Sequence, residues 1–427
     1  AELWSLPEEP AMALAEYSLG TSYSYLSQTY YVLETSVDQL DSTTKLNEAY
    51  LNQPGAFAEL TLRPLRDRRW SVNAFAEQSS EYLRGRLQSV FQPRSLARGV
   101  SGDFSLEARR RNNGAPEVGD EYTVGRAALK FGAALSQRTA GYLRLRGEFH
   151  DLGSADSAQF ASAYTNDYAK GGAEIGLDVD FANFDRLSFS AAVERRDVPD
   201  QTSLAYTALR FAWEYSGFIE SSYYTLALNI DNRDYDPSGD DADQRWFRFD
   251  ANGKFRLSES WSLVPELSLE AIDYRLDSST VSLDQTRSVA EVKLSRRWGL
   301  TALSLGPRLA TLSQEQPPLS RLQAFQYPEL EEFSEEYAEL AGVVEFEYFK
   351  LGLLILTIEN TLGHRNLELE DSYQSDYWFN RSTLFSSLEI GQRLRFDVVA
   401  SVEWEWHSQP SDDNAFYLLN STLAYTL

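Results

Sequence analysis

Long stretches of alternating apolar and polar residues constrain the fold of this chain more than any other feature. In the stretch RLRFDVVASVEWEW (393–406), one set of alternate positions is apolar from Leu394 to Trp406, and the other carries charges such as Arg395 and Glu403. A period of two is the period of a β-strand, whose successive side chains point to opposite faces. Strands of soluble proteins usually have about 5–6 residues, whereas a tilted strand needs about 9–11 residues to cross a bilayer. The length and pattern therefore favour a membrane-spanning strand.

The same pattern recurs along the whole chain. It is visible in AGYLRLRGEFH (140–150), GGAEIGLDVDF (171–181), RLSFSAAVERR (186–196), LRFAWEY (209–215) and WFRFDANGKFRL (246–257). We find no comparable stretch with the 3.6-residue period of a helix. No run of apolar residues is long enough for a transmembrane helix. The chain is therefore predicted to consist of strands.

The connections between these strands alternate in length. Short connections, such as 135–139 and 182–185, are separated by longer polar segments, such as 39–55 and 313–335. Outer-membrane barrels have short turns on the periplasmic side and longer loops on the outer side. We count about 20 strands, within a range of roughly 18–22, and bacterial barrels have an even number. The first is expected at Leu14–Leu33 and the last at Ala415–Leu427.

These patterns predict an all-β chain that forms a single closed antiparallel transmembrane β-barrel. A closed barrel pairs every backbone N–H and C=O group, as the interior of a bilayer requires. The barrel is expected to span residues 14–427, after a short periplasmic segment at 1–13. We see no composition shift that would mark a second domain.

The final stretch, FYLLNSTLAYTL, places Tyr417, Leu419, Leu423, Tyr425 and Leu427 on one face. It resembles the terminal strand of bacterial outer-membrane β-barrels of the porin type, although that class usually ends in Phe. In size and architecture the chain is also similar to the barrel component of porin–cytochrome conduits. The resemblance implies the outer membrane of a Gram-negative bacterium, with membrane lipid and lipopolysaccharide around the barrel.

The alternation also predicts which side chains face inward and which face outward. The polar set is expected to line the lumen, and tryptophans are expected to form girdles at the two membrane interfaces. Mixed charges in a lumen suit a weakly selective channel, and they suit equally a lumen that contacts a polar protein. The predicted lumen-lining residues are Arg144, Arg146, Glu148, Glu174, Asp178, Glu194, Arg210, Arg248, Asp250, Arg256, Glu291, Arg297, Arg395, Asp397 and Glu403, and the predicted girdle residues are Trp213, Trp261, Trp298, Trp404 and Trp406.

Composition argues against several classes of function. The net charge of −25 disfavours nucleic acid as a partner. The absence of cysteine excludes thiol catalysis and cysteine-ligated metals. The three histidines, His150, His364 and His407, lie where strands are expected to meet outer loops, and no GxSxG context accompanies them. We therefore expect neither catalysis nor a cofactor.

The segment DNRDYDPSGDDADQ (231–244) is rich in aspartate. Oxygen ligands at this density can bind Ca²⁺, which makes Asp236, Asp240, Asp241 and Asp243 candidate ligands. The segment lacks the ligand order and closing glutamate of an EF-hand. A solvated, extracellular acidic loop that needs no metal is the favoured interpretation.

Two functions compete. A barrel of about 20 strands is wider than the 16–18-stranded porins that leave an aqueous channel, so closure must come from somewhere. The main hypothesis is a wide conduit, either a pore or a sleeve whose lumen is occupied or capped by a partner protein, for example a multihaem cytochrome that carries electrons. The alternative is a porin for passive diffusion of small solutes that closes itself through Gln39–Gly55 and Ser313–Glu335. A surface adhesin or an outer-membrane enzyme is a minor alternative.

Overall fold

The structure is a computed structural model of the chain. It describes residues 14–36, 39–65, 69–79, 82–92, 99–111, 122–151, 167–199, 205–235, 243–275, 284–314, 336–367, 376–391, 393–408 and 413–426. The side chains of 25–53 and of a few residues at strand ends are not among those described.

Every regular element in the described residues is a β-strand. In chain order the strands are β1 (Ala15–Ser36), β2 (Gln39–Leu62), β3 (Trp70–Ser79), β4 (Tyr82–Phe91), β5 (Gly99–Arg111), β6 (Tyr122–Ala134), β7 (Thr139–Asp151), β8 (Tyr168–Asp180), β9 (Arg186–Asp197), β10 (Tyr206–Ile219), β11 (Ser222–Tyr235), β12 (Asp243–Arg256), β13 (Trp261–Arg275), β14 (Gln285–Trp298), β15 (Thr301–Gln314), β16 (Tyr337–Lys350), β17 (Leu354–Leu367), β18 (Tyr377–Ile390), β19 (Leu394–His407) and β20 (Asn414–Thr426).

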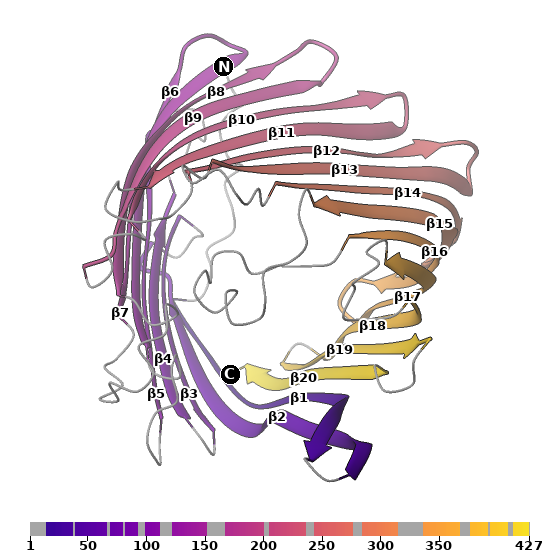
Figure 1. Cartoon of the computed structure of the whole chain (residues 1–427). Helices are drawn as coiled ribbons and strands as arrows, with labels where there is room; N and C mark the ends of the chain where they lie inside the picture. The colour runs from indigo at the N-terminus through magenta and orange to yellow at the C-terminus, as the bar shows by residue number, and fades with distance from the viewer. Residues whose placement is uncertain are drawn as a thin grey trace.

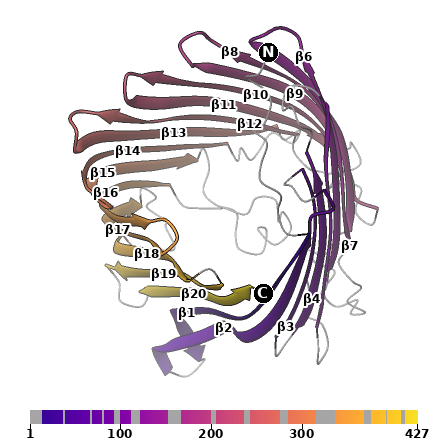
Figure 2. The ribbon, with the colours of Figure 1, turned by 180° about the vertical axis from the view of Figure 1, so that it is seen from behind.

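The strands form one sheet that closes on itself. Each strand pairs antiparallel with its neighbours in sequence, and β1 pairs with both β2 and β20. The resulting ring surrounds a central space, with β7 on one wall and β16 and β17 on the opposite wall (Figures 1 and 2). The prediction of a closed, all-β barrel of about 20 strands is confirmed. Among the described residues, no helix has the length and apolar character needed to span a membrane.

The connections define two ends of the barrel. At the turn end, short connections such as 135–138, 220–221 and 299–300 join consecutive strands. The opposite end, called the loop end here, is where β5, β7, β11, β13, β15 and β17 finish, and the segments that follow these strands fall outside the described residues. Gly299, in the two-residue connection of β14 and β15, has a φ of 56°. Tight hairpin turns require positive φ, which glycine adopts without steric cost.

The β8–β9 turn at this end is held by the Asp185 carboxylate. It accepts hydrogen bonds from the Tyr215 hydroxyl (2.5 Å), the Asn183 side-chain amide (2.7 Å) and the Phe218 backbone N–H (3.2 Å). The Tyr215 hydrogen bond is the main cause that lowers the pKa of Asp185 below its usual value. The charged form of Asp185 therefore helps to hold this turn against the end of β10, next to the turn of the β10–β11 hairpin.

The first hairpin differs from the sequence-based expectation. Residues 39–55 were predicted as a polar connection, but β2 runs through them and pairs with β1 from Ser36↔Gln39 to Ala15↔Leu62. β20 pairs with β1 only between Ser18 and Thr29, and β3 pairs with β2 only between Gly55 and Leu62. The far part of this hairpin therefore extends past its neighbours as a two-stranded ribbon. Its polar residues resemble a loop in sequence because such a ribbon has no core face to cover.

Candidate functional site

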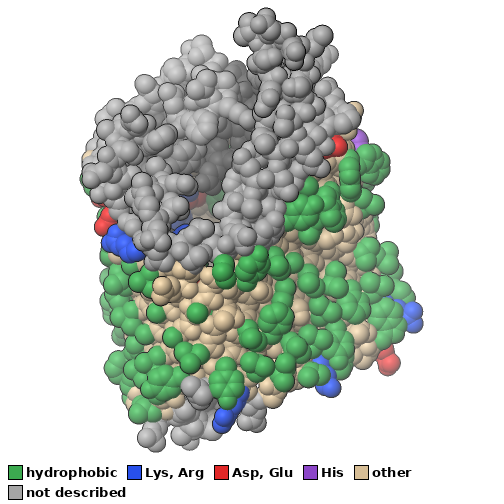
Figure 3. Space-filling model, turned by 90° about the horizontal axis from the view of Figure 1, so that it is seen from below, with side chains coloured by type: hydrophobic (Ala, Val, Ile, Leu, Met, Phe, Trp, Pro, Cys, Tyr) green, Lys and Arg blue, Asp and Glu red, His purple; other side chains and the backbone are tan. Residues whose placement is uncertain are grey.

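The alternation on each strand separates an outer face from a lumen face. On β7, Leu143 and Leu145 are 40% and 42% exposed and point outward, whereas Arg144, Arg146 and Glu148 occupy the intervening positions. Figure 3 shows the outer surface of the barrel covered mainly by hydrophobic side chains, with few charges on the face in view. An apolar exterior and a charged interior are the pattern of a barrel that spans a membrane.

The structure brings the predicted lumen-lining residues together on the inner face. Arg144 lies directly across from Glu174, Arg248 across from Asn229, and Arg381 across from Glu403. The remaining predicted residues share the same alternate positions of their strands: Arg146, Glu148, Asp178, Glu194, Arg210, Asp250, Arg256, Glu291, Arg297, Arg395 and Asp397. What these side chains do during transport stays a prediction.

Glu194 on β9 is the centre of an ion-pair network on one wall. Its carboxylate is buried, and it lies 2.9 Å from Arg210 of β10 and 3.3 Å from Arg146 of β7. Arg210 also reaches Asp231 of β11 at 2.9 Å. Side chains of β7, β9, β10 and β11 are thus linked by ion pairs in addition to the backbone pairing of the sheet.

The same wall carries cations without a carboxylate partner. Within the described residues, Arg144 of β7 forms no ion pair, and Lys130 of β6 contacts only the ring of Tyr142, 3.8 Å from its centroid. The Tyr142 hydroxyl donates to one oxygen of Glu174 at 2.7 Å, and Glu174 lies across from Arg144 without an ion pair between them in the described residues. This wall therefore presents free positive charge to the lumen.

On the β12–β17 side of the ring, several carboxylates surround Lys293, and Arg248, Arg287 and Arg308 line the same cavity as most of these groups. Lys293 on β14 lies between Glu291 (2.8 Å) and Glu345 (2.9 Å). Glu266 lies directly across from Glu291, and Glu359 directly across from Glu345. Neither Glu266 nor Glu359 forms an ion pair in the part of the chain that the structure describes. A cavity of about 370 Å³ is lined by these residues, except Glu345, and by their neighbours on β12–β17.

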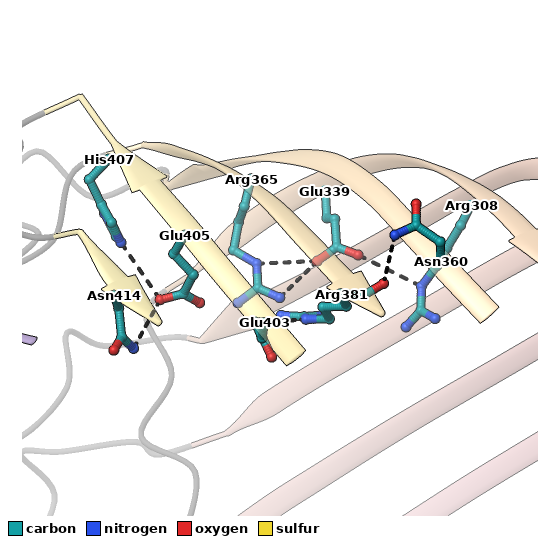
Figure 4. A network of polar contacts seen from close by, with 9 residues as sticks. All are labelled: Arg308, Glu339, Asn360, Arg365, Arg381, Glu403, Glu405, His407 and Asn414. Carbon is teal, nitrogen blue, oxygen red and sulfur yellow. Dashed lines mark hydrogen bonds and ion pairs between the residues drawn. The ribbon is translucent and has the colours of Figure 1, made fainter. Parts of the chain in front are cut away.

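A cluster of aromatic rings and arginines lies near the loop end of the lumen. Arg365 of β17 lies over the rings of Tyr337 (4.1 Å), Tyr377 (5.5 Å) and Phe379 (5.9 Å). It also binds the buried Glu339 of β16 at 2.7 Å (Figure 4). The alternation places these residues on the lumen face, but their mutual contacts depend on strand register, which sequence reasoning did not address.

Similar ring–cation contacts occur around the same end of the barrel. Arg109 lies over Tyr82, Arg196 over Tyr168 and Tyr206, and Arg233 over Tyr206. Cation–π contacts fix long arginine side chains against the wall. The outer mouth is therefore lined by ordered arginine side chains.

The three histidines are spread over both faces. His150 is stacked on Tyr168 at 5.1 Å in the lumen, and His407 packs on Tyr377 at 4.4 Å, with Glu405 3.7 Å away. His364 is on the outer face, where it contacts the ring of Trp378. The fold therefore does not gather the three imidazoles into one site.

The five predicted girdle tryptophans occupy outward positions at different heights. Trp261 and Trp298 lie at the turn end, where Arg296 is 5.2 Å and 5.3 Å from their rings. Trp404 and Trp406 lie towards the loop end of β19. Trp213 instead lies in the middle of β10, between Phe189 and Leu228, which is not an interface position.

Sequence reasoning missed a further tryptophan at the loop end. Trp378, at the second position of β18, is 56% exposed and directly across from Trp406. Its alternation with the buried Tyr377 and Phe379 could have revealed it. The two indoles together cover the outer face at this rim.

Of the four candidate Ca²⁺ ligands, only Asp243 lies among the described residues. Asp236, Asp240 and Asp241 lie outside the described residues. Asp243 accepts a hydrogen bond from the Tyr235 backbone N–H at 3.0 Å, which closes the β11–β12 hairpin. Among the described residues, no group of three or more acidic or histidine side chains is arranged to hold a metal ion. The metal-independent loop stays a prediction.

Comparison with known proteins gives similarity only at the level of solved structures. No protein-family model matches the chain, and no curated protein matches it. Similar structures include OpdK of Pseudomonas aeruginosa with vanillate (12% identity, 98% of this chain and 100% of that chain, TM-score 0.48) and OccK11 (OpdR) of the same organism (14%, 100% and 100%, 0.48). OccAB4 of Acinetobacter baumannii gives 11% identity over 98% and 100%, with a TM-score of 0.48. At such identities and TM-scores, we transfer no residue role from these structures.

The geometry of the barrel itself identifies the structural class of the protein. A closed ladder leaves no backbone edge in the bilayer, the exterior is apolar, and the interior is charged. The protein is a closed 20-stranded antiparallel β-barrel with the apolar outer face of a membrane-spanning barrel.

Proposed function

We propose that the protein forms a self-contained pore for passive diffusion of small polar and charged solutes across the outer membrane. The observation that carries this proposal is the separation of charge across the lumen. Lys130 and Arg144 present positive charge on β6 and β7, and Glu266 and Glu359 present negative charge on β13 and β17. In Figure 1, β17 lies across the ring from β7, and β13 lies in the arc between β7 and β17.

Free charges on a pore wall make contacts with a passing solute that paired charges do not. A solute that carries both signs can be oriented between the two walls, and an ion of either sign meets a favourable surface on one side. Rings of charged side chains set selectivity in channels in this way. A wall built to hold a protein partner would be expected to pair its charges on binding, and no feature of the described residues favours that alternative.

The test is single-channel recording of the purified protein in planar bilayers, with selectivity taken from the reversal potential in a salt gradient. We expect a stable, ion-selective conductance. Neutralising Lys130 and Arg144 to Gln should shift the selectivity towards cations, and neutralising Glu266 and Glu359 to Gln should shift it towards anions. Arg296→Gln is the matched control, because Arg296 faces outward between two tryptophans and should change nothing.

Two results would count against the pore. If heat-modifiable gel mobility shows that the protein is folded and the protein still gives no conductance, the pore is refuted. A large, unselective conductance that none of the lumen variants alters would favour a sleeve that lacks its occupant.

A further inference from the structure

Two carboxamides and a hydroxyl form a hydrogen-bonded cluster on the outer face of β17 and β18. The Asn360 amide nitrogen donates to the Asn380 side-chain oxygen (2.9 Å) and to the Ser382 hydroxyl (2.7 Å). The Ser382 hydroxyl donates to the same Asn380 oxygen at 3.1 Å. Asn360 also reaches the Arg381 backbone carbonyl (Figure 4).

The strand phase shows that this cluster faces the membrane. Asn360 alternates with Ile358 and Leu362, which are 41% and 49% exposed, whereas Thr361 is buried on the lumen side. Its cross-strand partner Val344 is 47% exposed. The cluster therefore lies inside the apolar belt rather than in the wet lumen.

The cluster leaves hydrogen-bonding capacity unused. Within the described residues, the amide nitrogen of Asn380 and the side-chain oxygen of Asn360 have no partner. Unpaired amide groups are costly in hydrocarbon, where no water can replace the missing bond. A polar group of this kind within a membrane indicates a further polar partner.

The surrounding surface permits close approach. Ser386, Ala400 and Ser421 continue the outer face across β18–β20 with small side chains, and Leu340 and Trp378, 63% and 56% exposed, stand beside it. In a bilayer the hydrophobic effect does not drive two apolar protein surfaces together, because lipid tails are equally apolar. Close packing of small residues and hydrogen bonds drive association instead. This face has both features.

We infer that the outer face of β17–β20 is the contact surface of a homodimer with a two-fold axis along the membrane normal. The free donor is the Asn380 amide nitrogen, and the free acceptor is the Asn360 side-chain oxygen. In a dimer, Asn380 of each copy can therefore donate to Asn360 of the other copy. Rotation about the membrane normal keeps every residue at its own height, so the two clusters meet. A contact between identical patches is the defining property of such a dimer.

A ring of three or more copies fits less well. Such a ring would place the cluster against a different surface of the next copy. Asn232 on β11 is also an outer-face carboxamide and is fourth from the loop end of its strand, as Asn380 is, but its side-chain oxygen is buried. In a ring, the free Asn380 donor would therefore find no exposed carboxamide oxygen on the described outer face away from the strand ends, apart from that of Asn360.

Cysteine cross-linking tests this directly, because the chain contains no cysteine. Asn380→Cys and Ser382→Cys should each give a disulfide-linked dimer when membranes are oxidised with copper phenanthroline. The matched control is Ile175→Cys on β8, which is 61% exposed on the opposite wall and should remain monomeric. Monomers from both test variants, or equal dimer yields from Ile175→Cys, would overturn the inference.

A second measurement removes the cluster itself. Native mass spectrometry in mild detergent should show a dimer for the unmodified protein and a monomer for Asn360→Leu/Asn380→Leu. Heat-modifiable mobility of the double variant shows that its barrel is folded, and the mobility should be unchanged. A trimer in the unmodified protein, or a dimer that survives the double substitution, would overturn the proposal.

Discussion

Removal of the Glu339 carboxylate isolates one electrostatic contribution to the stability of the lumen wall. The side chain of Glu339 is 1% exposed and receives two hydrogen bonds from Arg365, at 2.7 Å and 3.2 Å. Its other oxygen lies 3.7 Å from Arg308. Glu339→Ala would leave Arg365 without a counter-ion beside three aromatic rings.

The expected loss follows from the burial of the pair. Breaking a buried ion pair by removal of one partner costs about 3–5 kcal/mol. Arg365 is 17% exposed and keeps its ring contacts, and cation–π contacts contribute about 0.5–2 kcal/mol. We therefore expect the free energy of unfolding to fall by about 2–3 kcal/mol. Urea unfolding in lipid vesicles, followed by tryptophan fluorescence, measures this change.

The control is Asp397→Ala, which removes a pair of similar length with greater exposure. Asp397 lies 2.9 Å from Arg395, and the two side chains are 27% and 57% exposed, so the loss should be about 0.5 kcal/mol or less. Glu339→Ala/Arg365→Met should recover part of the loss, because no charge is then left unpaired. If Glu339→Ala costs no more than the control, or if the double variant is additive, the reasoning is wrong.

Three further outcomes are expected. The folded barrel should resist SDS until it is heated, because its ladder has no edge; a detergent-independent monomer with helical circular dichroism would refute the fold. Ala191→Arg on the lipid face should lower stability by about 2–4 kcal/mol, whereas Ala192→Arg, across from Glu174 in the lumen, should cost about 1 kcal/mol or less; equal losses in urea unfolding would reverse the face assignment. Because the pKa of Asp185 is lowered in the folded state, its contribution is present above the unfolded value of about 3.9 and is lost as the pH falls through the folded value, so unfolding at pH 7 and pH 3 should differ less in Asp185→Asn than in the parent.

The sequence predicted the strand phase well because the period of two is read from each strand alone. Arg144 and Glu174 were expected on one face from their own neighbours, without knowledge of their pairing. In the opening stretch, the expected strand at 393–406 corresponds to β19, Leu394–His407. The closed barrel followed because strand length, alternation and connection lengths each depend on local sequence.

Contacts between strands could not be read in this way. Lys293 lies between Glu291 and Glu345, which belong to strands on two sides of β15, and only the combined registers bring them together. The distance of Trp213 from the two ends of the barrel also depends on the residue at which β10 begins. Polar residues near the strand ends leave that first residue ambiguous in the sequence. Alternation fixes the face of a residue, but it does not fix its height or its neighbours.

The pairing of β1 with β20 has a consequence for the kinetics of folding. Every other neighbouring pair is consecutive in sequence, whereas this seam joins Ser18–Thr29 to Ala415–Thr426. The entropy lost on loop closure rises with the length of the chain between the paired residues, and contacts between distant segments slow folding. We expect the seam to form last. Until it forms, the backbone groups of two strand edges face the bilayer unpaired, and the lifetime of that open intermediate sets the interval in which the chain can aggregate.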